Sequence, residues 1–158
     1  MVAFRRNRSL RDTLVRARYD RLQPASAHAL GNSAFLLQKN MATSTHLTNE
    51  RAQTTVKTAG GNVGDRRVVY AAKCRRCQLI YVGHTTISPN KRFNIHRSDI
   101  AKHPDRSELP KHFNRNVECQ FNEDLEVHIL QRNIGGSRAL LEAAEDKWII
   151  RLNECQTQ

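Results

Sequence analysis

Short apolar blocks alternate with polar turns in the second half of the chain, as is typical of a small domain with strands and helices. RVVYAA at 67–72 and LIYVGHT at 79–85 are rich in β-branched and aromatic residues, which favour strands. The polar CRRCQ between them predicts a turn, so 67–85 is expected to be a β-hairpin. DLEVHILQ at 124–131 alternates apolar and polar residues and predicts a third strand.

Two longer helices are predicted around these strands. Ser88 followed by Pro89 is a typical helix start and predicts a helix over about 89–102. HPDRSELP is expected to be a loop, followed by a short helix at KHF. A second long helix is predicted over 138–153, with Ser137 as its cap. Its buried stripe is expected to comprise Leu141, Ala144, Trp148 and Leu152. The order strand–strand–helix–strand–helix predicts a small α+β domain over 67–158.

Residues 1–66 are predicted to be a basic N-terminal extension and linker. A short helix is expected near 9–22, where apolar residues recur at helical spacing. The stretch 23–66 is rich in small and polar residues, so it is expected to be partly disordered, with a weak helix over 34–39. Seven arginines in the first 22 residues are also compatible with a mitochondrial presequence or with a helix that contacts nucleic acid.

The charge balance points to a polyanionic partner. The 158 residues include 26 Lys and Arg against 15 Asp and Glu, a formal net charge of +11. Residues 67–115 hold 11 basic and 3 acidic residues, whereas 116–158 are net acidic. Such an excess favours nucleic acid or an anionic membrane surface as partner; a generally basic, soluble surface is the alternative. No apolar run is long enough to span a bilayer, so no membrane partner is expected.

Two of the four cysteines, Cys74 and Cys77, form a C-x-x-C pair in the turn of the predicted hairpin. No secretory leader is evident, so a reducing compartment is expected, where such a pair indicates metal or redox chemistry rather than a disulfide. A redox pair of the thioredoxin kind needs a helix directly after it, and none is predicted here. A tight turn can instead aim two thiolates at one zinc ion.

The sequence VVY, then YVG, then KRFNIH on a helix and EDKW on a later helix resembles the ordered motifs of the GIY-YIG nuclease domain. KCRRCQLIYVG, RFNIHRSDI, PKHFN and EDKWIIRLN are similar to the endonuclease of Penelope-like retroelements, and SLRDTLVRARY resembles a stretch upstream of it. The resemblance covers 67–153 and implies a three-stranded antiparallel sheet flanked by helices. It also implies nicking of DNA with a single divalent cation, Mg²⁺ or Mn²⁺.

The resemblance assigns catalytic roles to five residues. The motif tyrosines match Tyr70 and Tyr81, the helix arginine and the histidine one turn later match Arg92 and His96, and the metal-binding glutamate matches Glu145. Arginine can clamp phosphate oxygens, and a carboxylate can hold a hard cation that polarises the phosphate. Tyr70 can relay a proton, while His96 can orient water, orient Tyr70 or act as base. Singly, each residue is more simply explained as a packing or surface group; the ordered set favours catalysis.

Further residues are expected to bind zinc and DNA. The resemblance places a histidine pair of the retroelement domains in KHFNRNVEC, so His112 and Cys119 are expected to complete a structural zinc site with the C-x-x-C pair. His103 is the reserve ligand, Cys155 is expected to be a bystander, and free thiols are the alternative. The residues expected to bind the nucleic-acid backbone are Arg75, Arg76, Lys91 and Arg97.

The sequence departs from the family's pattern at two places. VVY stands where the family has GIY, so the first motif lacks its glycine. The family's supporting asparagine beyond the glutamate helix has no clear counterpart, because Asn153 comes too early. The chain is short for a retroelement protein and carries no polymerase portion, so it is expected to be a C-terminal fragment of one. Loss of that asparagine would weaken catalysis.

The predicted function is a metal-dependent DNA endonuclease, and the resemblance implies action in the nucleus, with mitochondria as the alternative. The first rival is a catalytically inactive, zinc-stabilised remnant that binds nucleic acid without cleaving it. The second rival is a basic structural protein, for instance of a ribonucleoprotein, which requires neither zinc nor Glu145. The oligomeric state is not predicted.

Overall fold

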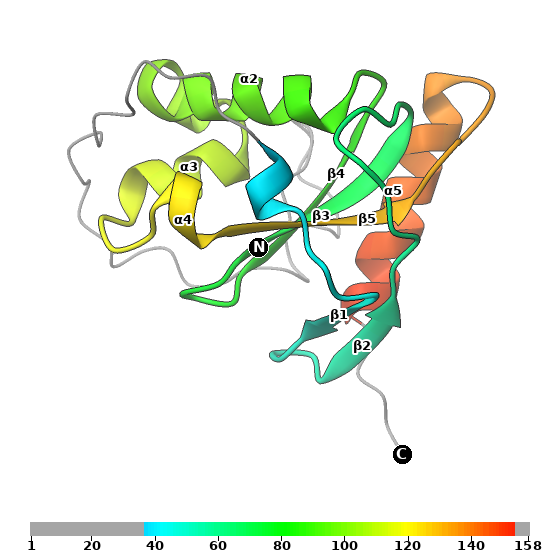
Figure 1. The fold of residues 1–158 in the computed structure, drawn as a ribbon, viewed down its shortest axis with the longest axis horizontal. Helices are drawn as coiled ribbons and strands as arrows, with labels where there is room; N and C mark the ends of the chain where they lie inside the picture. The colour runs from blue at the N-terminus through cyan, green and yellow to red at the C-terminus, as the bar shows by residue number, and fades with distance from the viewer. Residues whose placement is uncertain (1–36, 154–158) are drawn as a thin grey trace.

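Three antiparallel strands form the centre of the computed structural model, which describes residues 37–153 (Figure 1). The strands are β3 (Val68–Cys74), β4 (Ile80–Thr85) and β5 (Leu125–Gln131), and β3 lies between the other two. Both pairings are antiparallel, with Tyr70 opposite Gly83 on β4 and opposite Ile129 on β5. The predicted α+β class and three-stranded antiparallel sheet are confirmed. The helix expected near 9–22 lies outside the described residues.

Helices cover both faces of this sheet because β3 is apolar on both sides. Tyr70 and Ala72 face α2 (Pro89–Lys102) and α3 (Glu108–Arg115), where Phe93 and Phe113 complete one part of the core. The alternate residues of β3 pack against α5 (Arg138–Asn153), as does the β4 residue Val82. A strand that is buried on both faces reads as a continuous apolar run, which is the pattern VVYAA.

The two long helices begin and end where the sequence predicts. The Ser88 side chain caps α2 by accepting a hydrogen bond of 3.4 Å from the Lys91 N–H, and Pro89 takes the first helical position. The predicted stripe of α5 is buried. The expected loop HPDRSELP instead contains the short helix η2 (Pro104–Arg106) and the start of α3 at Glu108. The one-turn helix α4 (Phe121–Asp124) was not predicted.

The segment before residue 67 corrects the expectation of a partly disordered linker. It forms η1 (Leu37–Asn40) and a hairpin of β1 (His46–Asn49) and β2 (Thr54–Lys57). Leu37 is buried beside α2, while Leu47 and Val56 pack on the α5 side of the sheet. The expectation was wrong for 37–57 because each element contributes a single apolar anchor, too few to stand out against polar neighbours. The domain boundary at residue 67 stays a prediction.

Candidate active site and metal centre

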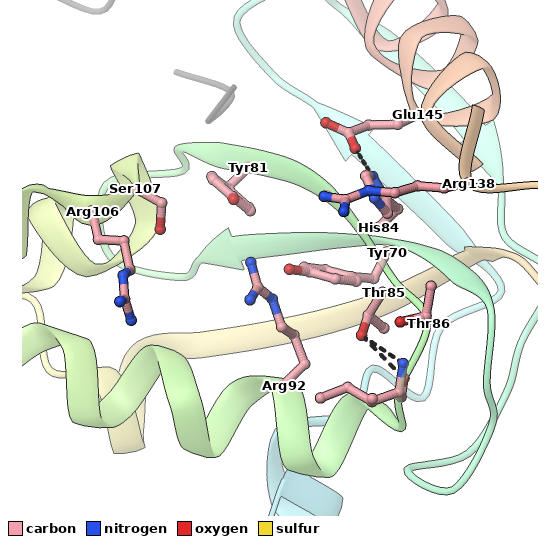
Figure 2. Close-up of a pocket in the computed structure, with 12 residues that line it drawn as sticks. Tyr70, Tyr81, His84, Thr85, Thr86, Arg92, Arg106, Ser107, Arg138 and Glu145 are labelled. Atoms are coloured by element: carbon pink, nitrogen blue, oxygen red, sulfur yellow. Dashed lines mark hydrogen bonds and ion pairs between the residues drawn. The ribbon is translucent and has the colours of Figure 1, made fainter. Parts of the chain in front are cut away.

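A cleft of about 410 Å³ crosses the free edge of strand β4 (Figure 2). Tyr81 lines it from the sheet face covered by α2, and His84 and Glu145 line it from the α5 side. The full lining comprises Tyr70, Tyr81, Gly83, His84, Thr85, Thr86, Ile87, Arg92, Arg106, Ser107, Arg138 and Glu145. Four of the five residues expected to be catalytic therefore meet at this cleft, although more than 60 positions separate the first from the last in sequence.

The hairpin places the two motif tyrosines on one face of the sheet. Their rings lie 6.4 Å apart at an interplanar angle of 28°. Gly83 makes this arrangement possible, because a Cβ atom at this position would lie 2.8 Å from the Tyr70 hydroxyl oxygen and 3.0 Å from the Tyr81 ring. Tyr70 has no room to yield, since it is fully buried against Phe93. The glycine after Val82 is thus required by packing around the tyrosine hydroxyl.

His96 lies behind Tyr70 rather than in the cleft. Its Nε2 atom is hydrogen-bonded to the Tyr70 hydroxyl at 3.0 Å, and its Nδ1 atom has no partner among the described residues. Burial lowers the pKa of His96 well below its usual value, and the nearby positive charge of Arg92 lowers it further. His96 is therefore neutral at physiological pH, and its hydrogen bond fixes the position of the Tyr70 hydroxyl.

Both tyrosines are held as neutral phenols by their surroundings. Burial raises the pKa of Tyr70, and it raises the pKa of Tyr81 more strongly. Arg92 acts in the opposite direction on Tyr70, because its guanidinium hydrogen-bonds the hydroxyl and stabilises the phenolate. The pair of Arg92 in front and neutral His96 behind makes Tyr70 the tyrosine better suited to transient proton transfer.

The neutral state of His96 predicts a component of acid sensitivity. The folded-state pKa lies below the unfolded value of about 6.5, so the unfolded state binds an additional proton as pH falls below 6.5. The free energy of unfolding should then fall by about 1.4 kcal/mol per pH unit for this one group. Urea denaturation at several pH values gives the free energy of unfolding as a function of pH. In H96Q, this free energy should fall less steeply below pH 6.5 than in the wild type. H103Q, a substitution at an exposed position, should keep the wild-type dependence. Equal slopes in wild type and H96Q would contradict the assignment.

Arg92 extends from α2 toward the two tyrosines (Figure 2). Its Nε atom is buried and has no hydrogen-bond partner among the described residues. An unpartnered buried donor is costly, which suits a group whose partner arrives with the substrate. A guanidinium fork matches phosphate oxygens in geometry and charge.

Glu145 approaches the cleft from α5 and contacts His84 (Figure 2). Its carboxylate Oε2 is paired with His84 Nδ1, and the residue is only 8% exposed. Among the described residues that line the cleft, Glu145 supplies the only carboxylate. A carboxylate oxygen is a fitting ligand for Mg²⁺ or Mn²⁺, so the donor type agrees with the cation that the resemblance implies.

Several cleft residues were missed by sequence reasoning. His84 directly follows the YVG motif, and this adjacency was a usable signal. Arg106, Ser107 and Arg138 come from segments that carry no motif, so only the three-dimensional arrangement reveals them. Asn153 donates its side-chain hydrogen bond to the Ile149 carbonyl, and it does not line the cleft.

A second cluster lies at the turn between β3 and β4. The thiol groups of Cys74, Cys77 and Cys119 and a ring nitrogen of His112 lie within 4.8 Å of one another. These are the four ligands that the sequence predicted, whereas the reserve ligand His103 is exposed and outside the cluster. Three thiols and an imidazole are a donor set of structural zinc sites.

The turn and α3 hold this cluster in place. The Cys74 backbone pairs with Leu79 and Gln78, and Gln78 has a positive φ of 61° that closes the turn. His112 Nε2 lies 3.5 Å from Cys77 Sγ, while the Asn116 amide contacts His112 Nδ1 at 3.0 Å. The hydrogen bond from Cys74 lowers the pKa of Cys77 to about 4. A thiolate is thus favoured beside the imidazole nitrogen, which is the state that binds metal.

The residues expected to bind nucleic acid lie in different surroundings. Arg75 is paired with Glu126 at 2.9 Å and Arg76 with Asp124 at 3.4 Å, both beside the cysteine turn. Lys91 is exposed on α2, and Arg97 is half-buried on the same helix. Their role in binding DNA stays a prediction. None of the described helices is both long and apolar enough to cross a membrane.

Comparison with known proteins identifies the family. The family model for the GIY-YIG catalytic domain matches residues 66–154, which is more than half of the chain. The chain therefore belongs to the GIY-YIG catalytic domain family. Domains of this family are nucleases that act on DNA. Neither the curated proteins nor the solved structures gave a match.

Proposed function

We propose that this chain is a DNA-nicking endonuclease of the Penelope-like retroelement type, dependent on one Mg²⁺ or Mn²⁺ and stabilised by a separate zinc ion. The observation that carries the proposal is the convergence of Tyr70, Tyr81, Arg92 and Glu145 on a single cleft. The retroelement origin rests on the motifs KCRRCQLIYVG and RFNIHRSDI and on the four donor groups at the turn. Action in the nucleus follows from that origin.

The residues divide the reaction between them. Arg92 binds the phosphate oxygens and stabilises the charge that develops on them. Tyr70 would act as general base through the transiently formed phenolate that Arg92 stabilises, taking the proton of the attacking water, while the hydrogen bond to His96 holds its oxygen in place. Glu145 would hold the divalent cation, which when bound polarises the phosphate and stabilises the leaving oxygen.

The test of this proposal is nicking of supercoiled plasmid by the purified chain with Mg²⁺, with Mn²⁺ or with EDTA. We expect relaxed plasmid only when a divalent cation is present. DNA binding measured in parallel separates the alternatives: tight binding without nicking would establish the inactive nucleic-acid-binding remnant. Absence of both zinc and nicking would favour the basic structural protein.

Gly83 offers a steric test of the tyrosine geometry. In G83A the new methyl group would press on the Tyr70 hydroxyl, so we expect nicking to fall at least about tenfold and unfolding free energy to fall by about 1–3 kcal/mol. The matched control is G135A, because nothing lies within 4 Å of a Cβ atom at Gly135. Full activity of G83A would show that the tyrosine hydroxyl does not need its present position.

A further inference from the structure

His84 is one of the cleft residues to which the proposed reaction assigns no role. It follows Gly83 on edge strand β4, and its side chain turns toward α5, away from the tyrosines (Figure 2). The His84 side chain is 14% exposed and that of Glu145 is 11% exposed. The His84 Nδ1 atom contacts Glu145 Oε2, so a nitrogen donor and a carboxylate donor lie side by side at the edge of the cleft.

The charges around this pair make a single carboxylate a weak cation site. Arg92, Arg106 and Arg138 line the same cleft, and Figure 2 shows the Arg138 side chain reaching past His84. Two of these charges are partly neutralised, because Arg138 pairs with Glu142 and Arg106 pairs with Asp99, each at 3.1 Å. A divalent cation held by one carboxylate among these arginines is opposed by their positive charge. A second ligand directed at the same point would offset that repulsion.

We propose that His84 Nδ1 is a second ligand of the divalent cation held by Glu145, and that it directs the site toward Mn²⁺ rather than Mg²⁺. The inference rests on the proposed function, which supplies the cation. Imidazole nitrogen is a good ligand for first-row transition metals, whereas Mg²⁺ keeps to oxygen ligands and bound water. The Mn²⁺ ion accepts both donor types, so a mixed histidine–glutamate site favours it.

An ordinary hydrogen-bonded pair is the competing explanation of the same contact. In that case His84 would only orient the carboxylate, and a glutamine at this position could replace it. A ligand role differs because it requires direct bonding between the ring nitrogen and the ion. Spectroscopy of bound Mn²⁺ distinguishes the two, since a directly bonded ¹⁴N nucleus modulates the electron spin echo of the ion.

The experiment uses the full chain, purified with zinc so that the cysteine cluster is filled, and Mn²⁺ as the probe. We expect the wild type to show ¹⁴N modulation. H84Q should bind Mn²⁺ about tenfold more weakly, and its bound Mn²⁺ should show no ¹⁴N modulation. The ratio of nicking rates with Mn²⁺ and Mg²⁺ should fall about tenfold in H84Q. H103Q, a histidine substitution on the exposed surface, is the matched control and should match the wild type.

Two outcomes would overturn the inference. One is bound Mn²⁺ without ¹⁴N modulation in the wild type, a result that does not depend on whether any variant folds. The other is modulation that persists in H84Q together with an unchanged ratio of rates. Metal-dependent nicking in either case would leave the proposed function intact, whereas a lack of nicking with both cations would contradict that function separately.

Discussion

Replacing Arg92 with alanine is expected to lower the rate of DNA nicking by about 10²–10³-fold, as the loss of one donor to developing charge typically does. The reason is that Arg92 lines the cleft beside both motif tyrosines, and its Nε atom has no hydrogen-bond partner within residues 37–153. R92K keeps the charge but loses the planar fork, so we expect it to recover only part of the rate. Single-turnover nicking at saturating protein measures the effect.

The matched control for Arg92 is Lys91, its neighbour on α2. Lys91 is exposed and does not line the cleft, so K91A removes the same charge from the same helix turn. K91A should weaken DNA binding slightly and leave the saturated nicking rate unchanged. Equal losses of rate in K91A and R92A would mean that Arg92 contributes only non-specific electrostatic attraction for DNA, and no contact with the phosphate that is cleaved.

Removal of zinc is expected to destabilise the whole domain. The four ligands join the β3–β4 turn to α3 and to the segment before α4, so the ion would connect parts of the fold that lie far apart in sequence. Binding that is restricted to the folded state contributes about 3 kcal/mol at a hundredfold excess over the dissociation constant. We expect chelation or C77S to lower the melting temperature by about 10 °C or more.

Cys155 provides the control for this prediction, because it is expected to lie outside the ligand set. C155S should match the wild type in zinc content and melting temperature. Zinc is expected at one equivalent per chain, measured by elemental analysis. Protein purified without zinc, with a melting temperature insensitive to chelators, would contradict a structural metal.

The sheet and long helices were predictable because their signals are local. Ser88 and Pro89 mark a helix start by capping chemistry alone, and the VVYAA run marks a strand buried on both faces. The β1–β2 hairpin was missed because its stability is not local. Leu47 and Val56 are anchored by α5, which lies about 90 residues further along the chain.

The site was predictable only in part for a related reason. The order of the motifs indicated Tyr70 and Glu145. No short stretch of sequence shows that β4 is an edge strand, with residues of both its faces lining the same cleft. That arrangement brings His84 to Glu145. The position of His96 behind Tyr70 likewise depends on tertiary packing. It leaves His96 a role only through its hydrogen bond to Tyr70.

The most direct measurement of the central claim compares nicking of supercoiled plasmid by wild type, E145A and E123A with Mg²⁺ and Mn²⁺. Glu123 is an exposed carboxylate on α4 that does not line the cleft, so E123A controls for the loss of one negative charge. We expect metal-dependent nicking by wild type and E123A, and none by E145A, which should still bind DNA. Nicking by E145A at the wild-type rate would contradict a role of Glu145 in holding the cation.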